Sequence, residues 1–102
     1  PDAPLSFASL RLDCSTHTVS SGSKSVHLTK TESAILKLLM QNPNQALSKG
    51  VILDRISLDT PDCTESSLKQ HVSNLRKKLK ALCGRDYIQS VWGIGFLLTE
   101  ES

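Results

Sequence analysis

One pattern constrains the fold of this chain more than any other, a set of apolar residues spaced for one face of a long helix. Successive members are 4, 3, 4 and 3 residues apart, and they are Leu68, Val72, Leu75, Leu79 and Leu82. At about 100° per residue, all five lie within roughly 40° of one line along a helix. The spacing therefore predicts a helix over 64–82 that buries this line and leaves its opposite side open.

The open side of this helix differs from that of a helix that is merely solvated. A solvated helix favours Glu and Lys in pairs four residues apart. This side instead carries small hydroxyls and amides, at Ser66, Gln70, Ser73 and Asn74, next to Lys77. Gln and Asn can form two hydrogen bonds with adenine in the major groove, and Ser is short enough to let the backbone approach. These side chains favour DNA binding over plain solvation.

Positive charge is concentrated in the same helix. Residues 64–85 hold six basic side chains and one acid, which gives +5, and the remaining residues hold six basic and nine acidic side chains, which gives −3; the sum is the net charge of +2. The six basic side chains are Lys69, Arg76, Lys77, Lys78, Lys80 and Arg85. A segment with this much positive charge usually binds a polyanion such as DNA. Lys69 lies beside the open side of the helix, so we expect it to contact DNA phosphates. The alternative is a protein-interaction module that docks an acidic partner.

Strand patterns occur at both ends of the chain. Alternating apolar residues over 5–12 predict a strand with one irregular step, and 16–19 and 25–28 predict two more strands around a turn. An antiparallel sheet therefore opens the domain. Near the C-terminus, 87–91 and 96–99 predict the two strands of a β-hairpin with a glycine-containing turn.

Two further helices are predicted between these strand regions. Thr29 and Glu32 are spaced as a capping box, which predicts a helix over 31–41 that ends before Pro43. Ser48 can cap a second, shorter helix that carries the apolar residues of 51–56.

We expect one domain over 5–102 behind a linker at 1–4, because 102 residues are too few for two separate cores. No pattern indicates an enzyme, a cofactor or a metal site. Gly93-Ile94-Gly95 follows a strand but precedes no helix, so it predicts a hairpin turn and not a nucleotide site. No apolar run approaches the roughly 20 residues of a membrane-spanning helix. The widely spaced cysteines are interpreted as reduced thiols of a cytoplasmic protein, and they are Cys14, Cys63 and Cys83.

Four motifs resemble, in order and spacing, the winged-helix effector domain of OmpR/PhoB-type response regulators. They are Leu28-Thr29-Lys30-Thr31-Glu32, Asn42-Pro43, His71-Val72-Ser73-Asn74-Leu75-Arg76-Lys77-Lys78-Leu79 and Ile88-Gln89-Ser90-Val91-Trp92-Gly93-Ile94-Gly95-Phe96. The resemblance extends from about Leu5 to Thr99. It implies an α+β fold, a winged helix-turn-helix with a four-stranded antiparallel N-terminal sheet, three helices and a C-terminal β-hairpin wing.

The resemblance also implies how a transcription regulator of this kind binds double-stranded DNA. The third helix enters the major groove, and the wing lies on the adjacent minor groove. The base-contacting positions of the family fall on Ser66, Ser67, Gln70 and Asn74. The backbone-contacting positions fall on Ser73, Arg76, Lys77, Ser90 and Trp92. The loop over 57–63 resembles the loop that activators present to RNA polymerase, and its residues include Leu58, Asp59, Thr60 and Asp62.

Two copies of the chain are expected to act together on DNA. Specific binding needs several kcal/mol more than non-specific binding, which is more than these few side chains can supply. We therefore expect a homodimer on repeated half-sites, joined through a receiver domain that lies outside these 102 residues.

Three positions depart from the family pattern. Ser73-Asn74 stand where many members carry two basic residues, and Ile56-Ser57 stand where an aromatic residue is frequent. Trp92 stands in the wing where arginine is usual. Its ring either covers an edge of the core or lies against the sugar and phosphate of DNA, and both alternatives stay open at this point.

Overall fold

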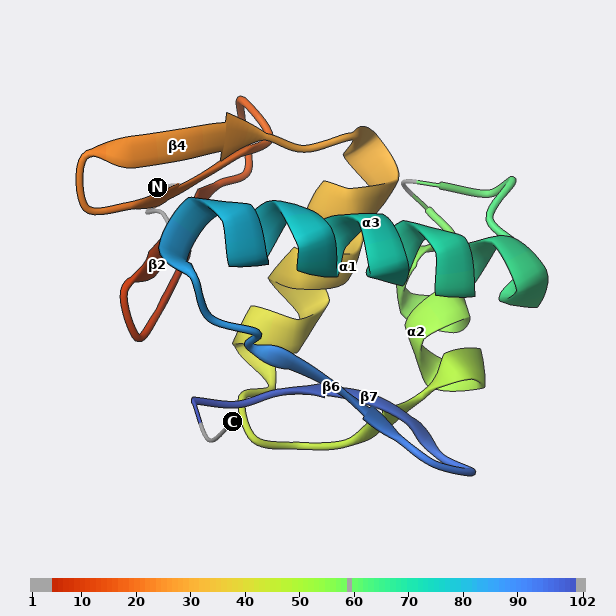
Figure 1. The fold of residues 1–102 in the computed structure, drawn as a ribbon. Helices are drawn as coiled ribbons and strands as arrows, with labels where there is room; N and C mark the ends of the chain where they lie inside the picture. Colours follow the sequence, from red (N-terminus) through yellow and green to blue (C-terminus); the bar gives the residue numbers. More distant parts are fainter. Residues whose placement is uncertain (1–4, 59, 101–102) are drawn as a thin grey trace.

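Three helices lie between a four-stranded N-terminal sheet and a C-terminal hairpin (Figure 1). The computed structural model describes residues 5–58 and 60–100, so the expected linker at 1–4 and Asp59 fall outside the described residues. The helices are α1 (Lys30–Gln41), α2 (Lys49–Ile56) and α3 (Glu65–Cys83). This arrangement confirms the predicted α+β architecture with three helices and a hairpin wing.

The N-terminal sheet is antiparallel throughout, with the order β1-β2-β3-β4. The prediction of one irregular strand over 5–12 was wrong. Ala8 adopts a φ of 53°, so the chain turns there and Phe7 pairs back onto Leu10. The third strand begins two residues later than expected because His17, with a φ of 53°, belongs to the preceding turn. The strands are β1 (Leu5–Phe7), β2 (Leu10–Asp13), β3 (Thr18–Ser21) and β4 (Lys24–His27).

The predicted capping signals of α1 and α2 are confirmed, and the structure adds a cap at α3 that was not predicted. At α1, the Thr29 hydroxyl accepts from the Glu32 amide at 3.2 Å, and the Glu32 carboxylate accepts from the Thr29 amide at 2.9 Å. Ser48 caps α2, and Thr64 caps α3. Gly84 ends α3 in the left-handed region with a φ of 74°, which an L side chain adopts only at a cost.

The apolar line of α3 is fully inside the protein, as its spacing predicts. All five of its residues belong to the core, together with side chains from α1, α2 and the sheet. Tyr87 extends this core toward the N-terminal sheet, because its ring meets Phe7 edge to face at 6.0 Å and its hydroxyl lies 3.1 Å from Ser9 Oγ. The helix is therefore held from several sides, and its roll about its own axis is determined.

The C-terminal hairpin belongs to a second sheet with the order β5-β7-β6. Its strands are β5 (Leu47–Ser48), β6 (Ile88–Val91) and β7 (Gly95–Leu98). The sequence did not predict β5, because two residues are too short for a strand pattern. This strand matters for the site, since Ser48 pairs with Gly95 and also caps α2. The wing is thereby fixed next to the start of α2.

Gly95 is required for this close pairing. A Cβ atom at this position would overlap the carbonyl oxygen of Leu47 and come within 2.9 Å of Ser48 Cα, whereas a Cβ atom at Gly50 would meet no atom within 4 Å. We predict that Gly95→Ala lowers the free energy of unfolding by about 3 kcal/mol, the upper range for overpacking. The matched control Gly50→Ala should raise it by up to about 1 kcal/mol, because alanine favours a helix. Urea unfolding followed by circular dichroism measures both, and equal stabilities would contradict the role of β5.

Candidate nucleic-acid interface

The side of α3 opposite the core is open to solvent. Ser66, Lys69, Gln70, Ser73 and Lys77 are all exposed, while Asn74 is half-buried. These are the positions that the spacing predicts to face outward. The open side thus combines hydroxyls, amides and cations over about three turns of helix.

Two amides on this side are already ordered relative to each other. Gln70 Nε2 donates to Asn74 Oδ1 at 3.2 Å, across one turn of α3. This bond uses one donor of Gln70 and one acceptor of Asn74, so each amide retains further hydrogen-bonding groups. The pair presents a fixed pattern of donors and acceptors, which lowers the entropy cost of binding a partner.

Ser67 differs from the other predicted base-contacting residues. It is half-buried, and its hydroxyl accepts from the Thr64 amide at 2.8 Å as part of the capping box of α3. It also donates to the Thr64 carbonyl at 3.1 Å. The Ser67 hydroxyl therefore stabilises the start of the helix, and contact with a base would require it to exchange one of these bonds.

A small hollow beside α3 brings together three of the predicted backbone-contacting residues. Ser73, Arg76 and Lys77 line it together with Lys80 and Asp86, and its volume is about 200 Å³. Arg76 Nη2 lies 2.7 Å from Asp86 Oδ2, so its charge is partly balanced within the protein. The hollow offers one hydroxyl and three cations, and this set of donors suits a phosphate group. We call it the phosphate hollow.

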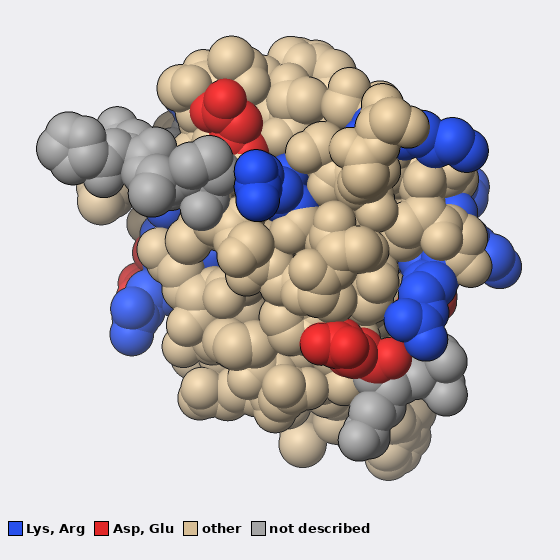
Figure 2. Space-filling view, turned by 90° about the vertical axis from the view of Figure 1, so that its left-hand side faces the viewer, with Lys and Arg blue, Asp and Glu red and all other residues tan. Residues whose placement is uncertain are grey.

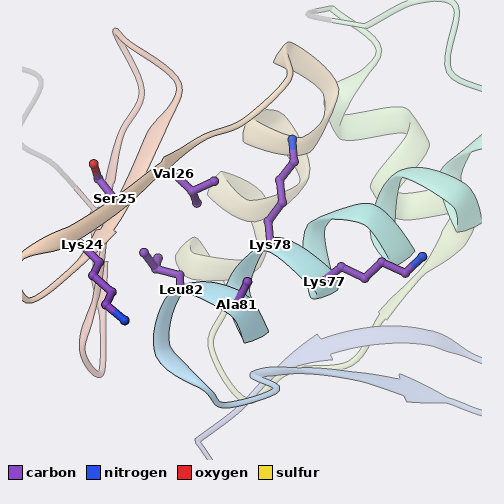
Figure 3. A pocket seen from close by; sticks show the side chains of 7 residues that line it. All are labelled: Lys24, Ser25, Val26, Lys77, Lys78, Ala81 and Leu82. Carbon is purple, nitrogen blue, oxygen red and sulfur yellow. The ribbon is translucent and has the colours of Figure 1, made fainter.

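The adjacent lysines of α3 have different environments. Lys78 Nζ lies 2.5 Å from Glu32 Oε1 and 3.4 Å from the His27 carbonyl oxygen, so it ties α3 to the start of α1. Lys77 points away from this contact and lines the groove between β4 and α3 at the rim farther from β4 (Figure 3). The Lys77 side chain can therefore bind an external partner, whereas the Lys78 side chain stabilises the packing of α3 against α1.

The wing and the helices enclose a wider cleft. Its volume is about 650 Å³, and it is lined by Lys49 at the start of α2, by Lys69 on α3 and by Ser90, Trp92 and Ile94 on the hairpin. The hairpin turn projects at the same end of the molecule as the first turns of α3 (Figure 1). Side chains of α3 and the wing can therefore reach one elongated partner together.

Trp92 is 97% exposed at the hairpin turn. The alternative in which its ring covers an edge of the core is wrong. The turn places the side chain beyond β6 and β7, where it extends into solvent.

The loop between α2 and α3 presents only part of its predicted surface. Leu58 is 95% exposed and Asp62 is exposed, whereas Asp59 lies outside the described residues. Thr60 is buried, and its hydroxyl donates to the Ile56 carbonyl at 3.1 Å. The Thr60 side chain therefore holds the loop onto the end of α2.

Charge is unevenly spread over the surface. Figure 2 shows the side of the molecule that is at the left in Figure 1, and most of this face is uncharged. Lys and Arg gather at its right-hand edge, the edge turned toward the front of Figure 1 where α3 lies. Within residues 5–58 and 60–100, no three His, Cys, Asp or Glu side chains are grouped as metal ligands, and no helix is long and apolar enough to cross a membrane.

Comparison with known proteins agrees with this geometry. The family described as "Transcriptional regulatory protein, C terminal" matches residues 23–98. The chain belongs to this family of OmpR/PhoB-type effector domains. Response regulator MprA from Mycobacterium sp. (strain KMS) is 36% identical over 98% of the chain, which spans 44% of that relative.

Solved structures of effector domains show the same fold. The C-terminal domain of the nisin resistance regulator NsrR superposes with a TM-score of 0.87 at 32% identity, over 96% of this chain and 99% of that one. The DNA-binding domain of response regulator AdeR, solved in complex with an intercistronic region, gives a TM-score of 0.79 at 28% identity, over 93% of this chain and 97% of that one. The four-stranded sheet and the wing implied by the resemblance are confirmed.

Two further cations, Lys80 and Lys49, line the hollow and the cleft of this effector domain and were not predicted as site residues. Lys80 follows Arg76 by four residues and Lys77 by three, so helical spacing alone could have added it to the phosphate hollow. Lys49 gave no such signal, because it reaches the wing cleft only through the pairing of β5 with β7.

The two neighbouring lysines of the effector domain give a matched test of this geometry. We predict that Lys78→Ala lowers the free energy of unfolding by about 1 to 3 kcal/mol, because Glu32 is 2% exposed and would lose its charged partner. Lys77→Ala should change it by less than about 0.5 kcal/mol. Chemical denaturation at two salt concentrations checks both values. Equal losses would mean that the Lys78 to Glu32 contact contributes nothing to stability.

Proposed function

We propose that this chain binds double-stranded DNA with sequence specificity, as the effector domain of a response regulator that controls transcription. The recognition helix α3 lies in the major groove, and the wing lies on the adjacent minor groove. One observation carries the proposal: the open amide and serine side of α3 adjoins both the phosphate hollow and the wing cleft along one flank of the helix. The structure of the AdeR DNA-binding domain in complex with an intercistronic region supports it by analogy.

Base contacts are assigned to the first half of α3. Ser66 and Gln70 are exposed, and Asn74 is held by Gln70, so these three can approach base edges directly. Ser67 is assigned to the margin of this contact, since its hydroxyl is engaged by Thr64.

Backbone contacts are assigned to one flank of the recognition helix and to the wing. Ser73, Arg76 and Lys77 bind one phosphate in the hollow, and Lys69, two turns earlier on the same flank, binds another phosphate beside the wing cleft. Ser90 and Trp92 approach the sugar-phosphate backbone from the wing. Phosphate contacts fix the register of the helix, and base contacts select the sequence.

The loop between α2 and α3 is proposed to face RNA polymerase. Leu58 and Asp62 carry this proposal, because both side chains are exposed. Thr60 supports this surface from inside, and the predicted contribution of Asp59 lies outside the described residues.

Two copies are proposed to bind repeated half-sites, joined through a receiver domain. The longest dimension of the described protein is 34 Å. Half-sites one helical turn apart lie roughly 34 to 36 Å from centre to centre, so two copies fit along the duplex when one of the shorter axes, 29 or 22 Å, follows the DNA. A bacterial regulator that binds chromosomal DNA works in the cytoplasm, which is the compartment proposed here.

An acidic protein partner is the second candidate, and one observation favours it. A groove of about 500 Å³ lies between β4 and the C-terminal half of α3, with Val26 and Leu82 on its floor and Lys24 at its rim (Figure 3). Lys77 also lines this groove, so the groove and the phosphate hollow share one cation. A gel mobility shift on DNA that Lys77→Ala leaves unchanged would favour this candidate over DNA.

Sequence readout by the amides has a direct test. We predict that Gln70→Ala or Asn74→Ala costs about 1 to 3 kcal/mol on a duplex selected from a random pool and little on random DNA. Lys77→Ala should weaken binding to both and reduce the slope of log affinity against log salt by about one. Fluorescence anisotropy at several salt concentrations measures these effects. Equal losses on both duplexes for the amide variants would show that Gln70 and Asn74 do not contact bases.

The pairing of Arg76 with Asp86 predicts a gain of affinity. In Asp86→Asn, the full charge of Arg76 becomes available to phosphate, so affinity for random DNA should rise and the salt slope should increase by about one. Asp13→Asn is the control for net charge. Hydrogen bonds from Ser15 hold the pKa of the Asp13 carboxyl below its usual value, so this substitution also removes a full charge at neutral pH. Equal gains in the two variants would contradict a specific role of Arg76.

A further inference from the structure

The tip of the wing is apolar and uncovered. Trp92 is 97% exposed and Ile94 is 53% exposed, although both are large side chains that proteins usually bury. Trp92 is also the single tryptophan of the chain. Between Val91 and Gly95 the turn contains no charged residue. Such a tip can contribute to binding only by contacting an apolar surface of a partner molecule.

The tip is held in place by the fold. The Ile94 amide donates to the Val91 carbonyl at 3.0 Å, and Gly93 adopts a φ of 77°, so the turn is tight. Gly95 pairs with both Val91 and Ser48, which fixes the hairpin to the second sheet. A rigid tip loses little conformational entropy on binding, so its apolar area contributes to affinity.

Two cations lie in the same cleft as the wing tip. Lys49 and Lys69 line the cleft together with Glu65, and Trp92 and Ile94 line it from the hairpin. If Lys49 and Lys69 contact the phosphates that border the minor groove of DNA, Trp92 and Ile94 lie over the floor of that groove. Inside the minor groove, apolar side chains act as wedges that unstack a base step and bend the duplex.

We propose that Trp92 and Ile94 enter the minor groove as an uncharged wedge that partly opens one base step. This inference rests on the function proposed above, moves the contact of Trp92 from the sugar-phosphate backbone to the floor of the groove, and adds a second source of specificity. A charged tip would favour the narrow groove of an A-tract, where the negative potential is strongest. An apolar wedge instead favours flexible pyrimidine-purine steps, since these unstack at the lowest cost. The wing thus selects deformable DNA without forming hydrogen bonds to bases.

The experiment uses the full chain and a duplex that it selects from a random pool, with 2-aminopurine replacing one adenine at a time. Anisotropy reports binding, 2-aminopurine emission reports unstacking, and Trp92 emission reports burial of the ring. We expect wild-type binding to raise 2-aminopurine emission several-fold at one step beside the half-site and to quench Trp92. Replacing that step by an A-tract should weaken binding about tenfold, the scale of one stacking contact.

Substitutions of Trp92 separate a wedge from other roles. Trp92→Ala should lose the 2-aminopurine signal and about tenfold in affinity with an unchanged salt slope, and Trp92→Phe should retain both. Trp92→Arg should lose the signal, raise the salt slope by about one and prefer the A-tract. Because the side chain is exposed, the three variants should unfold like wild type, which urea titration checks.

Two outcomes would overturn the wedge. One is DNA binding with unchanged Trp92 and 2-aminopurine emission, which leaves the proposed function intact. The other is a Trp92 emission that responds to protein concentration without DNA, which assigns the tip to a contact between proteins. Failure of the wild-type chain to select or bind any duplex by anisotropy would contradict the proposed function itself.

Discussion

The burial of one side of α3 is the interaction on which the rest of this structure depends. Leu68, Leu75 and Leu79 are fully inside the core, where they meet side chains from the sheet and from both other helices. Losing one such leucine typically costs 2 to 5 kcal/mol, so the helix cannot roll or shift without unfolding the domain. Every side chain on the opposite face therefore has a defined position, and the amide and serine surface is a consequence of core packing.

Ion pairs within the protein divide the cations of α3 into one that stabilises the fold and others that remain available to a partner. Lys78 is held by Glu32 and partly neutralised, so it joins α3 to α1. Arg76 shares its charge with Asp86 but still lines the phosphate hollow beside Lys77 and Lys80. The formal charge of the segment thus overstates the charge that a partner meets. The affinity for a polyanion then depends on how easily Arg76 exchanges Asp86 for phosphate.

Local signals predicted much of the fold, and contacts between distant residues account for the rest. Helix α3 follows from the spacing of its leucines, and α1 follows from its capping box, because both patterns act within a few residues. The turn at Ala8 was missed because a positive φ at a residue other than glycine leaves no clear trace in sequence. Strand β5 was missed because its two residues become a strand only by pairing with β7, nearly fifty positions later.

The same division holds for the candidate site. Helical periodicity identified Gln70, Ser73 and Lys77 as outward-facing, which the structure confirms. It could not show that Lys78 reaches Glu32, that Ser67 completes a cap, or that Lys49 lies beside the wing. These features depend on which elements become neighbours in three dimensions. The exposure of Trp92 likewise required the structure, since a tryptophan in a hairpin is compatible with a core edge as well as with a free tip.

The central claim is that one surface, formed by the open side of α3 and the wing, meets DNA. Its most direct test is an NMR titration of the isotope-labelled chain with a duplex selected from a random pool. If this surface binds DNA, amide shifts concentrate in residues 66–77 and 89–95, while the amides of β1 to β4 stay in place. Shifts that instead concentrate in the groove between β4 and the end of α3, with residues 66–74 unaffected, would contradict it.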